Sequence, residues 1–164
     1  KRSKMANFNT IRYNNPYSGA GSLVKISSAT ASSDSTISFT SGIDSTYKEY
    51  ISYFRAIHYE NDTTAFGYDT GGDLAQSTDF QNIITVIGAD NDQSGVGCMH
   101  LFNPSDTTFV KHFVVNAQKA HYSDISVNEF YAGYANTTSA IDAVQFKMSS
   151  GNIDSGTIIM YGVK

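Results

Sequence analysis

The feature that most constrains the fold is the apolar run that closes the chain. Its side chains fall into two alternating sets, and both are apolar: Ile158 and Met160 in one, Ile159, Tyr161 and Val163 in the other. A strand with two apolar faces is normally covered on both sides, because an exposed, flat apolar edge would aggregate. Residues 157–164 are therefore predicted to form a central strand of the core, although chain ends are usually poorly ordered.

Short segments of similar character recur along the chain between polar turns. The expected strands lie within 22–31, 35–41, 48–59, 80–88, 96–103, 107–117, 129–138, 144–150 and 157–164. Several alternate with period two, and no window shows an apolar stripe of helical period and length. The 48–59 segment is long enough for two strands or one bent strand. The pattern predicts an all-β fold, an antiparallel β-sandwich of jelly-roll-like type.

At 164 residues, the chain is expected to form one domain, residues 22–164, preceded by an arm or linker over residues 1–21. The arm is basic, while all fifteen acidic residues follow position 25. Such asymmetry predicts that the arm contacts an acidic surface, such as a neighbouring copy of the protein. A solvated tail is the alternative. The residues assigned to partner binding are Lys1, Arg2, Lys4 and Arg12.

The single cysteine, Cys98, excludes an internal disulfide framework. It sits in an apolar segment and is interpreted as a small buried residue with no reason to be reactive. His100 and His112 lie on neighbouring expected strands and could meet as a metal-binding or catalytic pair. No cysteine or carboxylate stands at ligand spacing, so ordinary strand histidines are favoured. We expect no catalytic residue, no metal and no cofactor.

Two acidic loops are candidate ligand sites. The loop at 90–95, "DNDQSG", matches the start of a calcium-binding loop, but its twelfth position is Leu101, where a bidentate acid is needed. The loop at 68–73, "YDTGGD", offers paired carboxylates of the kind that act on sugars. Plain turns are the favoured interpretation of both. The candidate residues are Tyr68, Asp69, Asp73, Asp90 and Asp92.

The composition also bears on partners. The acidic body disfavours nucleic-acid binding. No stretch of 18 apolar residues occurs, so no membrane-spanning helix is expected.

Three long phrases carry a resemblance: "STISFTSGIDSTYKEYI" (35–51), "HLFNPSDTTFVKHF" (100–113) and "YAGYANTTSAIDAVQFKMSSGNIDSGTIIMYGVK" (131–164). Together they resemble a β-rich domain of structural proteins from marine tailed bacteriophages, over about residues 22–164. One departure is that members of that family usually carry a further strand and glycine-rich loop between the "KEYI" and "FRAIH" elements, which here follow one another directly.

The resemblance implies a non-enzymatic virion part at the particle surface, either a capsid decoration (cement) subunit or a head or tail fibre module. It also implies a homo-oligomer, most simply a trimer, whose partners are the major capsid protein or other virion proteins. An alternative is a receptor- or glycan-binding module at a fibre tip, for which host surface glycans would be the ligand. An enzyme such as a capsule depolymerase is the weakest hypothesis, since it would need paired acids in a groove.

Overall fold

The computed structural model describes residues 23–59 and 77–164. Within these residues the chain forms eight β-strands and no helix. The strands are β1 (Leu23–Asp34), β2 (Ile37–Phe39), β3 (Glu49–Tyr59), β4 (Gly95–Phe102), β5 (Lys111–His121), β6 (Ile125–Ala135), β7 (Val144–Phe146) and β8 (Ile153–Val163). The predicted all-β antiparallel sandwich is confirmed.

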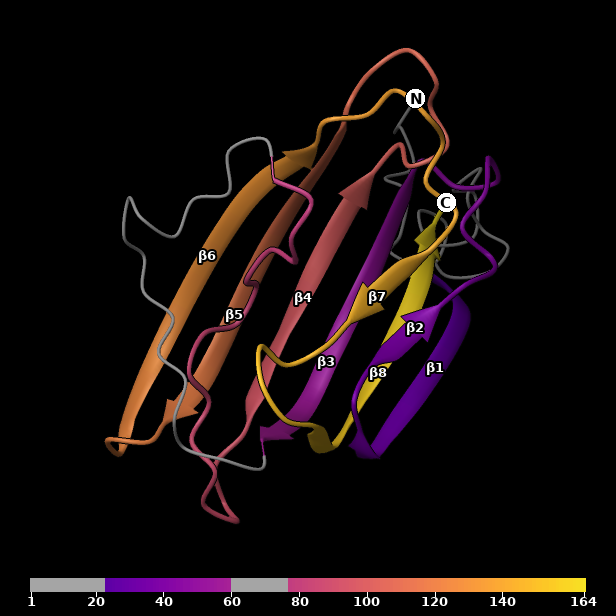
Figure 1. Ribbon diagram of the computed structural model, residues 1–164. Helices are drawn as coiled ribbons and strands as arrows, with labels where there is room; N and C mark the ends of the chain where they lie inside the picture. Colours follow the sequence, from indigo (N-terminus) through magenta and orange to yellow (C-terminus); the bar gives the residue numbers. More distant parts are fainter. Residues whose placement is uncertain (1–22, 60–76) are drawn as a thin grey trace, which may run out of the picture.

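Six strands form the main sheet in the order β1-β8-β3-β4-β5-β6, and β2 pairs with β7 in a small second sheet. The chain leaves the main sheet after β1 and after β6, adds one short strand to the small sheet, and then returns through β3 and β8. In Figure 1 the small sheet lies in front of the β1-β8-β3 half of the main sheet. We call the face of the main sheet that it covers the inner face and the opposite one the outer face.

The closing strand lies inside the sheet, as its two apolar faces predict. β8 runs antiparallel to β1 on one side and to β3 on the other. Ile158 and Met160 point to the inner face, while Ile159 points to the outer face, and all three are buried. The prediction of a central C-terminal strand is confirmed.

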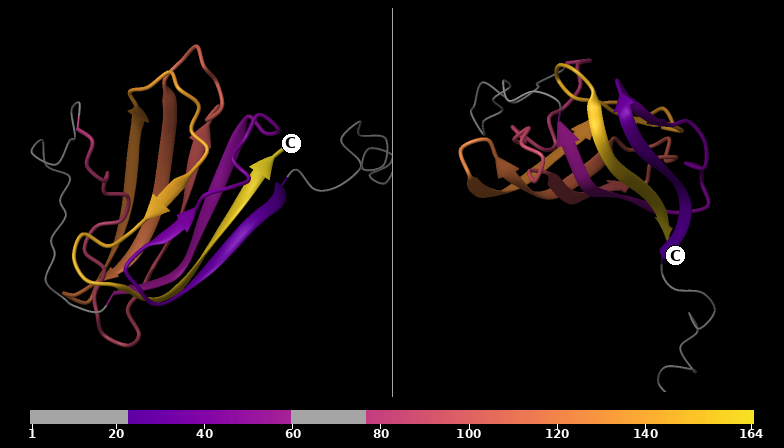
Figure 2. Two further views of the ribbon diagram at one scale, coloured as in Figure 1. Left: turned by 45° about the vertical axis from the view of Figure 1, so that its right-hand side comes forward. Right: turned by 90° about the horizontal axis from the view of Figure 1, so that it is seen from below.

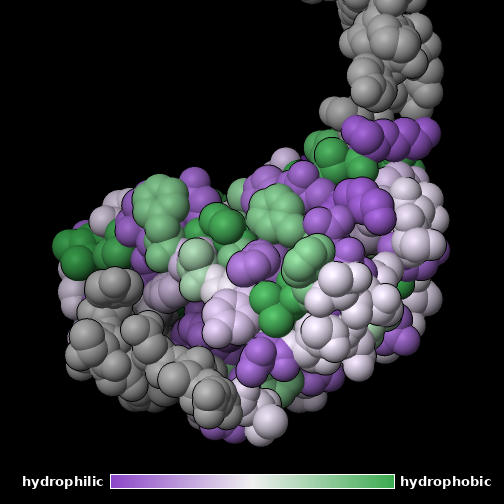
Figure 3. All heavy atoms as spheres, turned by 90° about the horizontal axis from the view of Figure 1, so that it is seen from above, coloured by the Kyte–Doolittle hydropathy of each residue, from purple (hydrophilic) through white to green (hydrophobic). Residues whose placement is uncertain are grey.

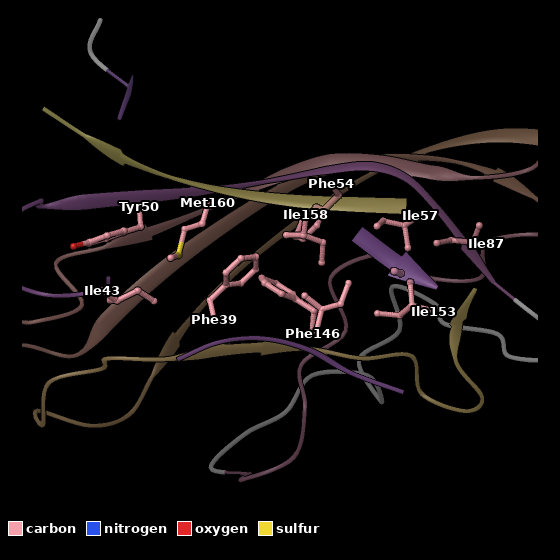
Figure 4. Packing of buried hydrophobic residues seen from close by; sticks show 12 residues of the cluster. Phe39, Ile43, Tyr50, Phe54, Ile57, Ile87, Phe146, Ile153, Ile158 and Met160 are labelled. Carbon is pink, nitrogen blue, oxygen red and sulfur yellow. The ribbon is translucent and has the colours of Figure 1, made fainter. Parts of the chain in front are cut away.

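The hydrophobic core fills the space between the main sheet and the small sheet. Phe146 of β7 makes edge-to-face ring contacts with Phe39 of β2 and with Phe54 of β3, at centroid distances of 6.3 and 5.2 Å. Figure 4 shows the Phe39 and Phe146 rings reaching from the small sheet toward Ile158. These aromatic side chains therefore join the two layers.

The 48–59 segment was expected to form two strands or one bent strand. It forms one bent strand, β3. Its pairing with β4 is irregular between Phe54 and Ile57, where Ala56 has a φ of 47°. Across the bend stands Gly156 of β8, with a φ of 119°, and a Cβ there would lie 2.7 Å from the Ala56 carbonyl oxygen. Glycine lets the two backbones approach where the bulge sharpens the twist.

The strand expected over 80–88 is not formed. Residues 77–94 instead form an irregular segment that lines the core with Ile83, Ile84 and Ile87. Its apolar run resembles a strand because it is buried, but it packs against the inner face without joining the ladder. Two backbone hydrogen bonds of 3.0 Å join it to β5: Gly88 N–H donates to the Ala120 carbonyl, and Ala120 N–H donates to the Ser94 carbonyl.

The main sheet is a single twisted layer, and the views in Figure 2 show the small sheet on one side of it. Figure 3 looks onto one end of the molecule, where hydrophobic and hydrophilic residues alternate in small patches. The small sheet leaves the opposite face of the main sheet uncovered.

Candidate functional surface

The outer face exposes large apolar side chains over its β4-β5-β6 half. Strand register places Val96 of β4, Val114 of β5, and Phe130 and Tyr134 of β6 on this face. Phe130 is 66 % exposed and Tyr134 is 58 % exposed. Exposed aromatic and aliphatic side chains gathered on one sheet face are candidates for an interaction site. We call these four residues the outer apolar patch.

The other half of the outer face buries its own apolar residues. Tyr53 of β3 and Tyr161 of β8 make an edge-to-face ring contact at 5.7 Å. Ile51 and Ile159, which the strand register places beside them, are only 6 % and 7 % exposed. The contrast with the outer apolar patch shows that an exposed sheet face need not leave such side chains in solvent.

Cys98, His100 and Glu49 form a hydrogen-bonded array on the outer face. The Cys98 Sγ and His100 Nε2 atoms lie 3.7 Å apart, and His100 Nδ1 lies 2.6 Å from Glu49 Oε1. Cys98 is half-buried. The expectation of a buried cysteine is wrong, because alternation along β4 turns Cys98 away from the core, to the same side as His100.

His112 shares the outer face with His100 but has a different partner. The strands place His100 opposite Val114, while His112 stands opposite Tyr134. The His112 ring packs against the Tyr134 ring at 5.8 Å, whereas His100 stacks near Phe102 at 6.2 Å. Among the described residues, no hydrogen bond or ring contact joins His100 to His112, so the alternative of a functional histidine pair gains no support.

The loops at one end of the main sheet are fastened together by backbone bonds and a buried lysine. Asn103 N–H donates to the Lys48 carbonyl at 2.7 Å, and Ile141 N–H donates to the Pro104 carbonyl at 2.8 Å. The side chain of Lys111 is fully buried and donates to two carbonyls from these loops, those of Phe109 at 2.7 Å and Thr137 at 3.2 Å. We call this arrangement the loop clasp.

All three phrases that carry the bacteriophage resemblance contribute to the loop clasp. Lys48 comes from the first phrase, Pro104 and Lys111 from the second, and Thr137 and Ile141 from the third. Segments distant in sequence are thus brought together at one end of the sheet. The backbone groups of these loops are thus satisfied by one another and by Lys111 at this end of the sheet.

Asp106 organises the loop that carries Phe109. Its carboxylate accepts hydrogen bonds from the backbone N–H groups of Thr108 at 2.6 Å and Phe109 at 2.8 Å. The Phe109 and Thr108 bonds hold the pKa of Asp106 below its usual value, and the nearby Lys111 charge adds to this. The Phe109 side chain itself is 70 % exposed, so the ordered loop presents an aromatic ring to solvent.

A second buried lysine fastens the irregular segment to the far half of the sheet. Lys119 of β5 forms an ion pair of 2.7 Å with Glu129 of β6, and both side chains bond to the hydroxyl of Thr85. The Thr85 N–H also donates to Glu129 at 2.9 Å. Burial raises the pKa of the adjacent Tyr131, and the Glu129 charge adds to the effect. We call Thr85, Lys119 and Glu129 the buried pin.

The candidate loop at 90–95 is a turn. Gln93 N–H donates to the Asp90 carbonyl at 2.8 Å, and the buried Gln93 side chain bonds back to Asp90 N–H at 3.3 Å. Asp90 and Asp92 are both exposed. Among the residues that the structure describes, no group of three or more histidines, cysteines or acids is arranged to hold a metal ion.

The other candidate residues fall outside the described ranges. These are Lys1, Arg2, Lys4 and Arg12 of the arm, and Tyr68, Asp69 and Asp73 of the acidic loop. Residues 23–59 and 77–164 contain no helix that is long and apolar enough to cross a membrane.

Comparison of the chain with protein-family models, with curated proteins and with solved structures finds no match.

Proposed function

We propose that this protein is a non-enzymatic structural subunit of a tailed-bacteriophage particle, serving as a capsid decoration subunit or a fibre module. The resemblance of residues 35–51, 100–113 and 131–164 supports the class of protein. The single structural observation that carries the proposal is the outer apolar patch. A two-layer β body with one half-face of exposed aromatic and aliphatic side chains is suited to pack against another protein.

The chemistry of the patch favours protein as its partner. Phe130 and Tyr134 are aromatic residues of the kind enriched at the centres of protein interfaces. Asn116 and His112 stand opposite them on β5 and supply hydrogen-bonding groups beside the rings. In the proposed particle the patch packs on a second copy of the chain in a homo-oligomer or on the major capsid protein.

The basic arm is the second proposed contact of the subunit. Lys1, Arg2, Lys4 and Arg12 would bind an acidic shell surface by charge attraction, which weakens as salt is added. Deletion of residues 1–21 should therefore reduce occupancy on purified particles and leave the folded body intact by circular dichroism. Unchanged occupancy would remove the arm from the mechanism.

The patch is tested with the double variant Phe130→Ser, Tyr134→Ser. Sedimentation velocity of the full chain, over a wide concentration range, should show self-association for the parent protein and a monomer for the variant. Tyr122→Ser is the matched control, because Tyr122 is also exposed but lies in the turn between β5 and β6. If parent and double variant sediment and bind particles alike, the outer apolar patch is not the interface.

A further inference from the structure

The outer face holds a second feature that the proposed packing role does not use. We propose that Cys98 is a nucleophilic thiol, served by His100 as its base, that forms mixed disulfides by exchange with disulfide-bearing molecules. Glu49 acts as a positioning residue for His100. The chain has one cysteine, so this chemistry links the protein to another molecule and cannot close an internal bridge.

The geometry has the order of a nucleophile, a base and an orienting acid. Glu49 Oε1 lies 2.6 Å from His100 Nδ1, so the carboxylate accepts the proton on that nitrogen. This leaves the lone pair of Nε2 available toward the Cys98 Sγ atom, 3.7 Å away. An orienting acid, a histidine in one tautomer and a nucleophile in reach are the elements by which a weak nucleophile is activated.

Strand register holds the three side chains in place. Cys98 and His100 are two positions apart on β4 and therefore share the outer face. Glu49 reaches His100 diagonally from β3, where it stands opposite Phe102. The Phe102 ring lies nearly parallel to the imidazole, with an interplanar angle of 20°. The His100 ring is thus held by the Glu49 carboxylate from β3 and by the Phe102 ring from its own strand.

The surroundings favour a disulfide over a carbonyl substrate. Backbone N–H groups around Cys98 belong to a strand paired on both sides, and acyl transfer needs free donors at a developing oxyanion. Disulfide exchange spreads charge along three sulfur atoms and requires only proton handling at the entering and leaving thiols. The half-buried position of Cys98 on an open sheet face gives a small disulfide access to the sulfur.

The exchange step balances without an added oxidant. His100 Nε2 takes the thiol proton as the Cys98 sulfur attacks one sulfur of the disulfide. A new S–S bond forms to Cys98, the old S–S bond breaks, and its electron pair leaves on the second sulfur. That sulfur takes the proton back from His100 and departs as a thiol.

Ionisable groups of the flanking strands on this face bear on any pH dependence. They are Glu49, Tyr53 and Arg55 on β3 and His112 on β5. Of these, Glu49 forms the hydrogen bond to His100.

The test measures the rate at which the folded full chain reacts with the aromatic disulfide DTNB at two pH values. Dividing the rate at about pH 7 by the rate at about pH 9.5 cancels differences in access, and an ordinary thiol of pKa near 8.5 gives a ratio of about 0.03. The parent protein should give a ratio at least about five times larger, because His100 supplies the base at neutral pH. His100→Asn should return the ratio to about 0.03.

Two further variants separate this role from a merely structural one. Glu49→Gln should lower the ratio several-fold while the circular dichroism spectrum is unchanged, whereas His112→Asn, a histidine change on the same face, should leave it as in the parent. A parent ratio near that of an ordinary thiol, or equal ratios for His100→Asn and the parent, would overturn the proposal. Mass spectrometry after incubation with oxidised glutathione should show one mixed disulfide, and Cys98→Ser should show none.

Discussion

The buried pin gives the sharpest prediction about how the molecule holds its shape. Lys119 is 2 % exposed and Glu129 has a side chain 12 % exposed, so each charge depends on the other for compensation. Removing one partner of a buried ion pair typically costs about 3–5 kcal/mol. Glu129→Gln leaves a buried ammonium beside the Thr85 hydroxyl, and we expect a loss of about 3–5 kcal/mol in the free energy of unfolding.

Lys119→Met should cost less, about 2–3 kcal/mol, because Glu129 keeps its bond from Thr85 N–H and its partial contact with water. The double variant Lys119→Met, Glu129→Gln leaves no unpaired charge, only Thr85 groups that are less well paired, and should lose about 1–3 kcal/mol. The loss in the double variant is therefore smaller than the sum of the two single losses, by a coupling energy of about 2 kcal/mol or more. Urea unfolding followed by far-ultraviolet circular dichroism measures each value. Single losses below about 1 kcal/mol that simply add would refute this account of the pin.

Three further predictions address the core, the last strand and the loop that carries Phe109. Phe146→Ala should cost about 3–5 kcal/mol in urea unfolding because the ring joins the two layers, whereas Phe109→Ala, at a 70 % exposed ring, should cost little. Removal of residues 157–164 takes away most of the interior strand between β1 and β3, and a soluble, cooperatively unfolding product would contradict the role given to β8. Asp106→Ala should lower the melting temperature at pH 7. Because the pKa of Asp106 is lowered in the folded protein, its carboxylate stabilises the fold above about pH 4, and this stabilisation fades as the pH falls through the folded-state pKa. The difference in melting temperature between the parent and Asp106→Ala should therefore shrink in acid.

Alternation of side chains made most of the fold predictable. Eight of the nine expected strands formed, and two apolar faces placed β8 inside the main sheet, between β1 and β3. The failure at 80–88 has a simple cause. An apolar run indicates that a segment is buried and does not by itself show that the segment is a strand. The run Ile83–Ile87 is buried because it packs on the inner face of the main sheet without pairing as a strand.

The polar interior was harder to predict than the strands. Side chains point to alternate faces along β5. Lys111 and Lys119 therefore lie on the same face as the core residues Val115 and Ala117, which is the inner face. The charge of the two lysines argued against a buried position, because lysine is seldom fully buried without a partner. Apart from the nearby Phe109 carbonyl, the partners are the Thr137 carbonyl and Glu129, and the pairing of β5 with β6 brings these close.

The cysteine array was missed for the same reason. The spacing of Cys98 and His100 puts both on one face, and that part was available from the sequence. Glu49 lies 51 positions before His100, and its approach depends on the register of β3 with β4. Register between distant strands is fixed by the whole core, so no local pattern could supply it.

The two proposals for the outer face meet at one row of the sheet. Tyr53, Cys98, Asn116 and Phe130 stand opposite one another across β3, β4, β5 and β6. A subunit packed on Phe130 and Asn116 would therefore reach the edge of the thiol and shield it. Association should slow the labelling of Cys98 at both pH values alike, without changing their ratio, because cover limits access and leaves the His100 base in place. Loss of the His100 base changes the ratio in the monomer as well. An interface without a reactive thiol would therefore slow labelling on association while the ratio stays that of an ordinary thiol. A reactive thiol without an interface would give a raised ratio and no slowing.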